Sequence, residues 1–115
     1  MKPPCIFCRI ARREAPASIL YEDDQCLVFR DTNPQAPVHL LVIPRKHIIS
    51  LNENLEDDKI LLGHMMAIVG QMAKAQGIEG SGFRTVINTN REAGQTVYHL
   101  HIHILGGRQL NWPPG

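Results

Sequence analysis

Charge of one sign, long apolar runs and paired cysteines are all scarce in this sequence, and each scarcity excludes a class of protein. Twelve basic residues balance eleven acidic ones and leave a net charge of +1. The basic residues never form a run longer than Arg12-Arg13 or Arg45-Lys46. A protein that binds nucleic acid needs a denser basic patch to neutralise phosphates, so we expect no nucleic-acid partner.

No apolar run approaches the roughly 20 residues that a membrane-spanning helix needs. The first residues, Met1–Cys5, lack the apolar core of a signal peptide. The three cysteines are an odd number in a chain without an export signal, which argues against a disulfide framework. We therefore expect a cytoplasmic protein that does not bind membranes.

The composition that is present is typical of one small globular domain. The chain is 43% hydrophobic and 20% charged, which is ordinary for a soluble protein. Its 115 residues suffice for a single hydrophobic core. No internal repeat, linker or low-complexity tract divides it. We predict a single domain that covers residues 1–115.

Two segments have the residue spacing of helices. The apolar positions of residues 6–12 fall on one face of a short helix. A longer helix should begin at Asn54, a favourable N-cap residue that is followed by acidic residues, and should end at Gly77. Apolar residues recur with helical period between these two positions, so we expect this helix to pack on a sheet.

Five segments have the composition of strands and should form an antiparallel sheet. The segment Val38–Pro44 is apolar at nearly every position, which places it at the centre of the sheet. With the two helices, this pattern predicts an α+β fold. The five predicted strands are Ile19–Glu22, Cys26–Arg30, Val38–Pro44, Phe83–Asn88 and the histidine-containing segment that follows Thr96. In the hairpin made by the first two, we expect Leu27 and Phe29 or their neighbours on the buried face, and Cys26 as a small core residue.

Three of the six histidines lie in the segment Val97–Gly107, each separated from the next by one aliphatic residue. Strict alternation predicts a strand with His99, His101 and His103 on one face and an apolar row on the other. The apolar row would anchor the strand to the core and leave the imidazoles facing a pocket. Neighbouring rings would lie about 6.5 to 7 Å apart, a span that suits a phosphate-sized ligand.

Two chemical roles are open to such a row of histidines. Imidazole is the commonest metal ligand, so two or three of the rings could hold Zn²⁺. Alternatively, one ring is a nucleophile, because a neutral histidine that donates Nδ1–H to a backbone carbonyl leaves Nε2 free to attack phosphorus. The strand alone does not choose between them. For His64, outside this segment, we expect an ordinary hydrogen-bonded, half-exposed side chain.

The residues around the histidines resemble a known family. The segment Gly94–His103 resembles the signature of the histidine triad (HIT) family. Three further segments, Asp31–His39, Leu41–His47 and Gly106–Gly115, resemble its Hint branch, the histidine triad nucleotide-binding proteins with purine nucleoside phosphoramidase activity. The resemblance covers nearly the whole chain. It implies a HIT-like fold in which two sheets join across a homodimer.

The resemblance also implies an enzyme that hydrolyses purine nucleoside 5′-phosphoramidates, such as AMP-amine or AMP-lysine, to AMP and the free amine. His101 would attack the phosphorus and form a covalent nucleotidyl-histidine. His103 would hydrogen-bond the phosphate oxygens, Thr96 would add a donor, and His39 would orient the other histidines. No metal is needed for this chemistry. The expected partners are AMP, GMP and adenosine phosphoramidates.

A set of nucleotide-binding residues follows from the same resemblance. Apolar side chains would sandwich the base, the Asp31 carboxylate would accept hydrogen bonds from the ribose, and the loop before the histidines would contact the phosphate. Trp112 would reach the site of the partner protomer. The implied set is Ile6, Phe7, Ile10, Phe29, Asp31, Thr32, Asn33, Leu41, Asn88, Gly94, Gln95, Thr96, Val97, His101, His103 and Trp112.

Cys5 and Cys8 form a Cys-x-x-Cys pair, for which a metal or redox role outranks a disulfide in a reducing compartment. Two free thiols are the plain alternative. A tetrahedral structural Zn²⁺ needs two further ligands. The resemblance to HIT proteins that carry this cysteine pair implies that they are His47 and His99, in which case the role of His99 is architectural.

Two other functions stay open. A dinucleoside polyphosphate hydrolase of the Fhit-like branch would use the same histidines, although the Trp-Pro-Pro-Gly ending and the Gly-Gln-Thr loop favour the Hint branch. A nucleotide-binding regulatory or interaction protein, in which hydrolysis is incidental, belongs to a different class. The intact set of three histidines argues against it.

Overall fold

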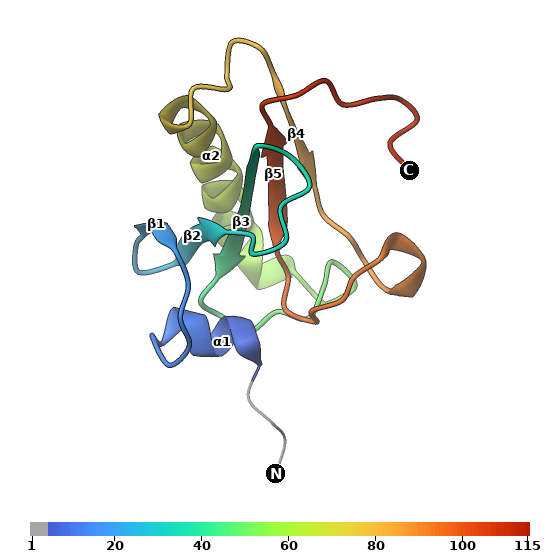
Figure 1. The fold of residues 1–115 in the computed structure, drawn as a ribbon. Helices are drawn as coiled ribbons and strands as arrows, with labels where there is room; N and C mark the ends of the chain where they lie inside the picture. The colour runs from blue at the N-terminus through green and yellow to red at the C-terminus, as the bar shows by residue number, and fades with distance from the viewer. Residues whose placement is uncertain (1–4) are drawn as a thin grey trace.

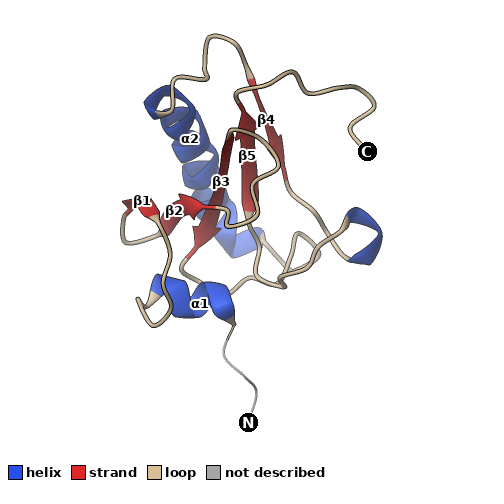
Figure 2. Ribbon diagram, in the orientation of Figure 1, coloured by secondary structure: helices blue, strands red, loops and turns tan. Residues whose placement is uncertain are grey.

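The computed structural model describes residues 5–115, which form two α-helices, five strands and two short 3-10 turns (Figures 1 and 2). The helices and turns are α1 (Ile6–Ala11), η1 (Glu56–Asp58), α2 (Lys59–Ala75) and η2 (Arg91–Ala93). The strands are β1 (Ile19–Glu22), β2 (Cys26–Arg30), β3 (Val38–Pro44), β4 (Phe83–Val86) and β5 (Ile102–Gly106).

The strands form one antiparallel sheet in the order β1-β2-β3-β5-β4. β3 lies at the centre, as its apolar sequence predicts, and pairs with β2 on one side and β5 on the other. The register between β3 and β5 places Leu41 opposite His103 and His39 opposite Leu105. The predicted α+β fold, a five-stranded antiparallel sheet with one short and one long helix, is confirmed.

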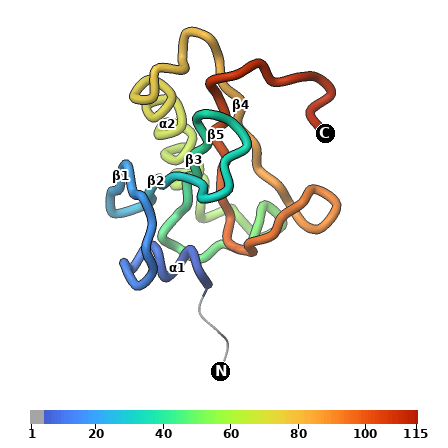
Figure 3. The backbone as a smooth tube through the Cα atoms, in the orientation of Figure 1, coloured from blue at the N-terminus to red at the C-terminus, as the bar shows by residue number. Residues whose placement is uncertain are grey.

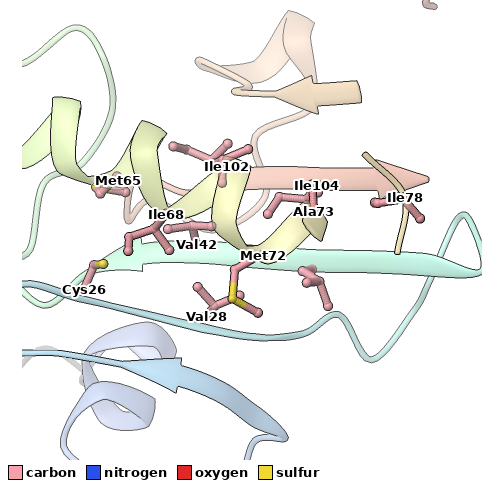
Figure 4. Close-up of a cluster of buried hydrophobic side chains, with 12 residues drawn as sticks. Cys26, Val28, Val42, Met65, Ile68, Met72, Ala73, Ile78, Ile102 and Ile104 are labelled. Carbon is pink, nitrogen blue, oxygen red and sulfur yellow. The ribbon is translucent and has the colours of Figure 1, made fainter. Parts of the chain in front are cut away.

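The two helices cover opposite faces of the sheet. Buried residues of α2, among them Met65, Ile68 and Met72, pack on the face that carries Val28 and Val42 (Figure 4). Because side chains alternate along a strand, the neighbouring residues of β2 and β3 point to the other face. There they pack against α1 in a second core cluster of Phe7, Ile10, Leu27, Phe29, Leu41 and Ile43.

This double covering buries both faces of β2. Leu27 and Phe29 are buried as expected, but Cys26 and Val28 on the opposite face are equally buried. Because α1 covers one face and α2 the other, β2 has no solvent-facing row except at Arg30. The Cys26 side chain is a small core residue beneath α2, and burial raises the pKa of its thiol to about 12.

The histidine strand is shorter than predicted. β5 begins only at Ile102, so His99 and His101 precede it and only His103 lies within it. Pairing with β3 stops at Val42, opposite Ile102. Pro44, two residues after Val42, has no N–H to donate to a neighbouring strand. Its carbonyl accepts from the His99 side chain. The chain therefore joins the sheet only after His101.

Two other element boundaries differ from prediction. β4 ends at Val86, before the predicted end at Asn88. The long helix begins at Lys59, because the Asn54 side chain accepts a hydrogen bond from the Glu56 amide and initiates the η1 turn in front of it. The predicted end is confirmed, since Gly77 with φ of +72° follows α2.

One hydrogen bond joins α2 to the turn between β1 and β2. His64 Nε2 lies 2.6 Å from Asp23 Oδ2, and both side chains are partly exposed, which confirms the expected ordinary role of His64. Burial opposes ionisation of Asp23, but hydrogen bonds from the Cys26 amide, His64 and Gln25 outweigh it and hold the pKa well below its usual range.

The ends of the described chain lie far apart. The tube view in Figure 3 shows α1 near one end of the sheet, whereas the segment after β5 leaves the sheet at the opposite end. Within residues 5–115, neither helix combines the length and the apolar character that crossing a bilayer requires.

Candidate active site

A pocket of about 460 Å³ lies between α1 and the sheet face that α1 covers. One part of its lining is apolar and comes from α1, β2, β3 and the loop that follows α1. The other part is polar and comes from the residues after β2 and from the histidine segment. The lining residues are Ile6, Phe7, Ile10, Ala15, Pro16, Ala17, Phe29, Arg30, Asp31, Thr32, Leu41, Thr96, Val97, His101 and His103.

His101 lines the pocket with its proton placement determined by the backbone. Its Nδ1 lies 2.8 Å from the carbonyl oxygen of His99, which can only accept, so Nδ1 carries the proton. The neutral ring therefore has its lone pair on Nε2. The ring is 7% exposed and is held edge-on by Phe7, whose centroid lies 5.1 Å away. This is the arrangement that a histidine nucleophile requires.

His103 belongs to a chain of hydrogen bonds that starts at the backbone. The Gln35 amide donates to His39 Nδ1 at 3.0 Å, so the proton of the neutral His39 ring is on Nε2. That Nε2 lies 2.9 Å from His103 Nδ1 and donates to it. The proton of His103 is consequently on Nε2, the opposite tautomer from His101. One ring thus offers an acceptor and its neighbour a donor.

Both rings of this chain are neutral near pH 7. Burial, together with the neighbouring His101 and His39 rings, lowers the pKa of His103 to about 4, against a small opposing effect of Asp31. Burial also lowers the pKa of His39, and Asp31 again opposes the shift. The Asp31 carboxylate lies 3.3 Å from His39 Nε2 and accepts from the Asn33 amide.

Five residues of the predicted binding set do not line this pocket. Gln95 is buried beneath the loop, with its amide bonded to backbone atoms. Trp112 is 81% exposed, so a role for it requires a second chain. The five residues are Asn33, Asn88, Gly94, Gln95 and Trp112. The remaining predicted residues, from Ile6 to His103, all contribute to the lining.

Sequence reasoning missed part of the wall. Ala15, Pro16, Ala17 and Arg30 line the pocket but were not predicted. The three residues after α1 carry no chemical signal, and they reach the pocket only because the chain turns back after the helix. Arg30 directly precedes the predicted Asp31, so extending that segment by one residue could have found it.

A second cluster of side chains lies beside the pocket and brings together Cys5, Cys8, His47 and His99. The two histidine Nδ1 atoms lie 3.2 Å apart, and Sγ–Nδ1 distances are 3.3 to 3.6 Å. A tetrahedron with the usual zinc bond lengths has N···N edges of about 3.3 Å and S···N edges of about 3.5 Å. The donor atoms therefore match the geometry of a structural zinc site.

The protonation of His99 supports the same assignment. Its Nε2 donates to the Pro44 carbonyl at 2.8 Å, which leaves the Nδ1 lone pair directed at the cluster. Two thiols and the His47 ring converge on that single lone pair. One acceptor cannot satisfy all three, whereas a cation at the centre would accept a lone pair from every member of the cluster.

Two other groups of acidic, cysteine and histidine side chains within residues 5–115 do not suit a metal. In the group of Asp31, His39 and His103, the Gln35 amide keeps the His39 proton on the nitrogen that a metal would need. In the group of Asp23, Cys26 and His64, the high pKa of the Cys26 thiol opposes formation of the thiolate ligand.

Comparison with known proteins is consistent with this geometry. Residues 12–110 match the model of the HIT domain family. A HIT-like protein of Synechococcus elongatus is 56% identical over the whole of both chains. A HIT family hydrolase of Legionella pneumophila superposes with a TM-score of 0.95 at 49% identity, covering 97% of this chain and 100% of that one. A histidine triad nucleotide-binding protein of Candida albicans superposes with a TM-score of 0.82 at 30% identity, covering 96% and 83%.

Proposed function

The chain belongs to the HIT domain family, and we propose that within it this protein hydrolyses purine nucleoside 5′-phosphoramidates, in the manner of the Hint branch. The observation that carries the proposal is the bond between His101 Nδ1 and the His99 carbonyl, which leaves an unprotonated Nε2 on a ring that lines a nucleotide-sized pocket. A pocket of about 460 Å³ with a mostly apolar wall and a few polar groups is typical of small-molecule sites.

The reaction proceeds in two displacements at phosphorus. In the first, the lone pair of His101 Nε2 forms a bond to phosphorus, the P–N bond to the amine breaks, and the leaving nitrogen takes up a proton from solvent. In the second, water attacks phosphorus and gives up a proton to solvent, the bond between phosphorus and Nε2 breaks, and AMP is released with the neutral ring restored. His103 Nε2–H donates to a phosphate oxygen as negative charge develops.

The neutral state of His103 serves this role. With its pKa lowered to about 4, the ring donates one hydrogen bond near pH 7 and does not add a second positive charge next to the nucleophile. His39 acts as a positioning residue. Its Nε2–H donates to His103 Nδ1 and so keeps the His103 proton on Nε2. Thr96, an exposed residue of the lining, adds a hydroxyl donor.

The rest of the pocket accounts for nucleoside binding. Phe7 and Ile10 on α1 and Phe29 on β2 supply flat and aliphatic surfaces that would sandwich a purine. Asp31 contributes a carboxylate that would accept hydrogen bonds from ribose hydroxyls. AMP, GMP and adenosine phosphoramidates all present these groups.

We also propose a structural Zn²⁺ at Cys5, Cys8, His47 and His99, whose donor atoms have tetrahedral spacing. The ion would join α1 to the segments that follow β3 and precede β5, and it takes no part in the displacements. A homodimer is proposed on separate grounds. β4 is an edge strand with Phe83 exposed, and pairing with a second copy would cover that edge. The exposed Trp112 would then reach the partner.

Hydrolysis of an adenosine 5′-phosphoramidate, followed by release of the amine, tests the function. We expect wild-type turnover to exceed that on diadenosine triphosphate, and His101→Gly to abolish turnover while AMP still binds. His64→Gln, a half-exposed histidine outside the pocket, is the matched control and should behave as wild type. Undiminished turnover by His101→Gly would exclude the nucleophile. Faster cleavage of diadenosine triphosphate would assign the protein to the Fhit-like activity instead.

A further inference from the structure

The loop between β4 and the histidine segment contains a backbone conformation that is rare for its residue. Asn90 has φ of +66° and ψ of −173°, a region that is occupied almost only by glycine. Within residues 5–115, the only other non-glycine residue with positive φ is Arg13. Such a conformation persists only when the surroundings hold it in place.

Two hydrogen bonds to one buried residue, Gln95, hold Asn90 in this conformation. Gln95 is 5% exposed, and its Oε1 accepts from the Asn90 amide at 2.8 Å. The backbone N–H of Gln95 in turn donates to the Asn90 carbonyl at 3.1 Å. Both backbone groups of the strained residue are therefore paired with Gln95, and the short η2 turn and Gly94 are enclosed between them.

The same side chain reaches the pocket wall. Gln95 Nε2 donates to the Val97 carbonyl at 3.2 Å and to the Ile49 carbonyl at 2.8 Å. Val97 and its neighbour Thr96 line the pocket, and Ile49 lies two residues beyond the proposed zinc ligand His47. The amide thus joins three segments with one acceptor and two donors, all of which are occupied.

We propose that Gln95 is a positioning residue that holds Thr96 and Val97 against the substrate's phosphate by maintaining the strained conformation of Asn90. The proposal rests on the proposed function, and it assigns Gln95 a role other than the direct phosphate contact expected from the sequence. A carboxylate of the same shape could not donate to the carbonyls of Ile49 and Val97. These carbonyls would repel it and move it away from the Asn90 amide, so Asn90 would lose the hydrogen bond that holds its strained conformation.

The test compares the affinities of AMP and adenosine by calorimetry, because their ratio isolates the phosphate contact from the base and ribose contacts. We expect Gln95→Glu to lower the AMP affinity by about tenfold or more and to change the adenosine affinity by less than about twofold. The control is Gln71→Glu, the same change on an exposed residue of α2, and it should leave both affinities unchanged.

Asn90→Gly provides the decisive second variant. Glycine adopts this φ and ψ without strain, so the hydrogen bond from residue 90 to the side chain of residue 95 should no longer be needed. We expect Asn90→Gly alone to keep the wild-type ratio, and Asn90→Gly to restore most of the lost ratio in the Gln95→Glu background. If the ratio of AMP affinity to adenosine affinity stays low in the double variant, Gln95 does not act through the strained conformation of Asn90, and the proposal is overturned. Equal losses of AMP and adenosine in Gln95→Glu would overturn the positioning role.

Folding failure also decides the question. If circular dichroism shows that Gln95→Glu is unfolded, the double variant is measured instead. A folded double variant with the wild-type ratio supports the proposal, and an unfolded one overturns it, because Gln95 would then support the whole domain and not this loop. Absence of phosphoramidate turnover in wild-type protein would remove the proposed function but leave the binding ratio readable. Wild-type protein that binds AMP no more tightly than adenosine would overturn the phosphate contact itself.

Discussion

Metal removal at the cluster of Cys5, Cys8, His47 and His99 should produce a measurable loss of stability. A ligand that binds only the folded state, held at 100 times its dissociation constant, stabilises it by about 2.7 kcal/mol. For a 115-residue chain, the unfolding entropy near 60 °C is about 240 cal/mol/K, so the midpoint should rise by about 11 °C. We expect that rise between protein treated with a chelator and the same protein with free Zn²⁺ buffered at about 100 times its dissociation constant, as measured by scanning calorimetry.

Two cysteine variants separate the cluster from general effects of metal. Cys8→Ser should abolish the zinc-dependent rise, because a hydroxyl is a poor zinc ligand at neutral pH. Cys26→Ala is the matched control, since Cys26 packs beneath α2 on the other face of the sheet. It should lower the baseline stability and keep the zinc-dependent rise. Equal midpoints with and without zinc in wild-type protein, or an unchanged rise in Cys8→Ser, would refute the assignment.

The same perturbation should reach the nucleotide pocket. α1 carries Phe7, which packs edge-on against both His99 and His101, and the His99 carbonyl holds the His101 proton. Chelation should therefore lower the affinity for AMP. Linkage requires that AMP raise the affinity for zinc by the same factor. Chelator competition with and without AMP measures the change in zinc affinity, and calorimetry with and without zinc measures the change in AMP affinity. An AMP affinity that does not change when zinc is removed would refute the coupling.

Three further substitutions test the pocket, the core and the pH dependence. Phe7→Ala should lower AMP affinity by roughly tenfold through lost aromatic contact, and an unchanged dissociation constant would exclude Phe7 from the base site. Met65→Ala, at a fully buried position, should cost about 2 to 5 kcal/mol in urea denaturation, and a cost below about 1 kcal/mol would contradict the packing described. The neutral His103 faces His101, His39 and Asp31, and its folded pKa of about 4 lies below the unfolded value. The unfolded chain therefore binds more protons in acid, and stability should fall as pH drops from about 6.5 towards 4. His103→Asn should flatten that slope, and an equally steep slope would reject the shift.

Periodicity was sufficient to predict the sheet and the long helix, because burial on a pleated surface imposes a period that sequence displays directly. Val38–Pro44 is central for this reason, and Gly77 ends α2 because it adopts a positive φ. Boundaries failed where a side chain competes with the backbone. The side-chain oxygen of Asn54 accepts from the Glu56 amide and initiates a separate turn ahead of the helix. The His99 ring donates to the Pro44 carbonyl that a strand partner would have used. Neither competition leaves a trace in hydrophobic spacing.

The site was predictable to the extent that chemistry is carried by residue type. Cys5 and Cys8 were identified from their spacing, and the family resemblance supplied the pairing with His47 and His99 that the structure brings together. The tautomers of His39 and His103 could not be predicted, since they depend on which backbone group lies next to His39. The Gln35 amide determines the protonation of His39, and a bare amide has no sequence signature. The role of Gln95 was missed for a related reason, because the loop buries a polar side chain that the sequence suggests would face substrate.

The aliphatic residues that alternate with the histidines explain how this segment is held in place. Leu100, Ile102 and Ile104 are all nearly inaccessible, so the aliphatic row anchors the segment even where it is not a strand. The histidine row is not one surface. His99 turns to the cysteines, whereas His101 and His103 lie 5.0 Å apart at the pocket, closer than the spacing of a regular strand. The start of β5 at Ile102 permits this division. A strand that began before His99 would hold all three rings in one row and leave the cysteine pair without its buried ligand.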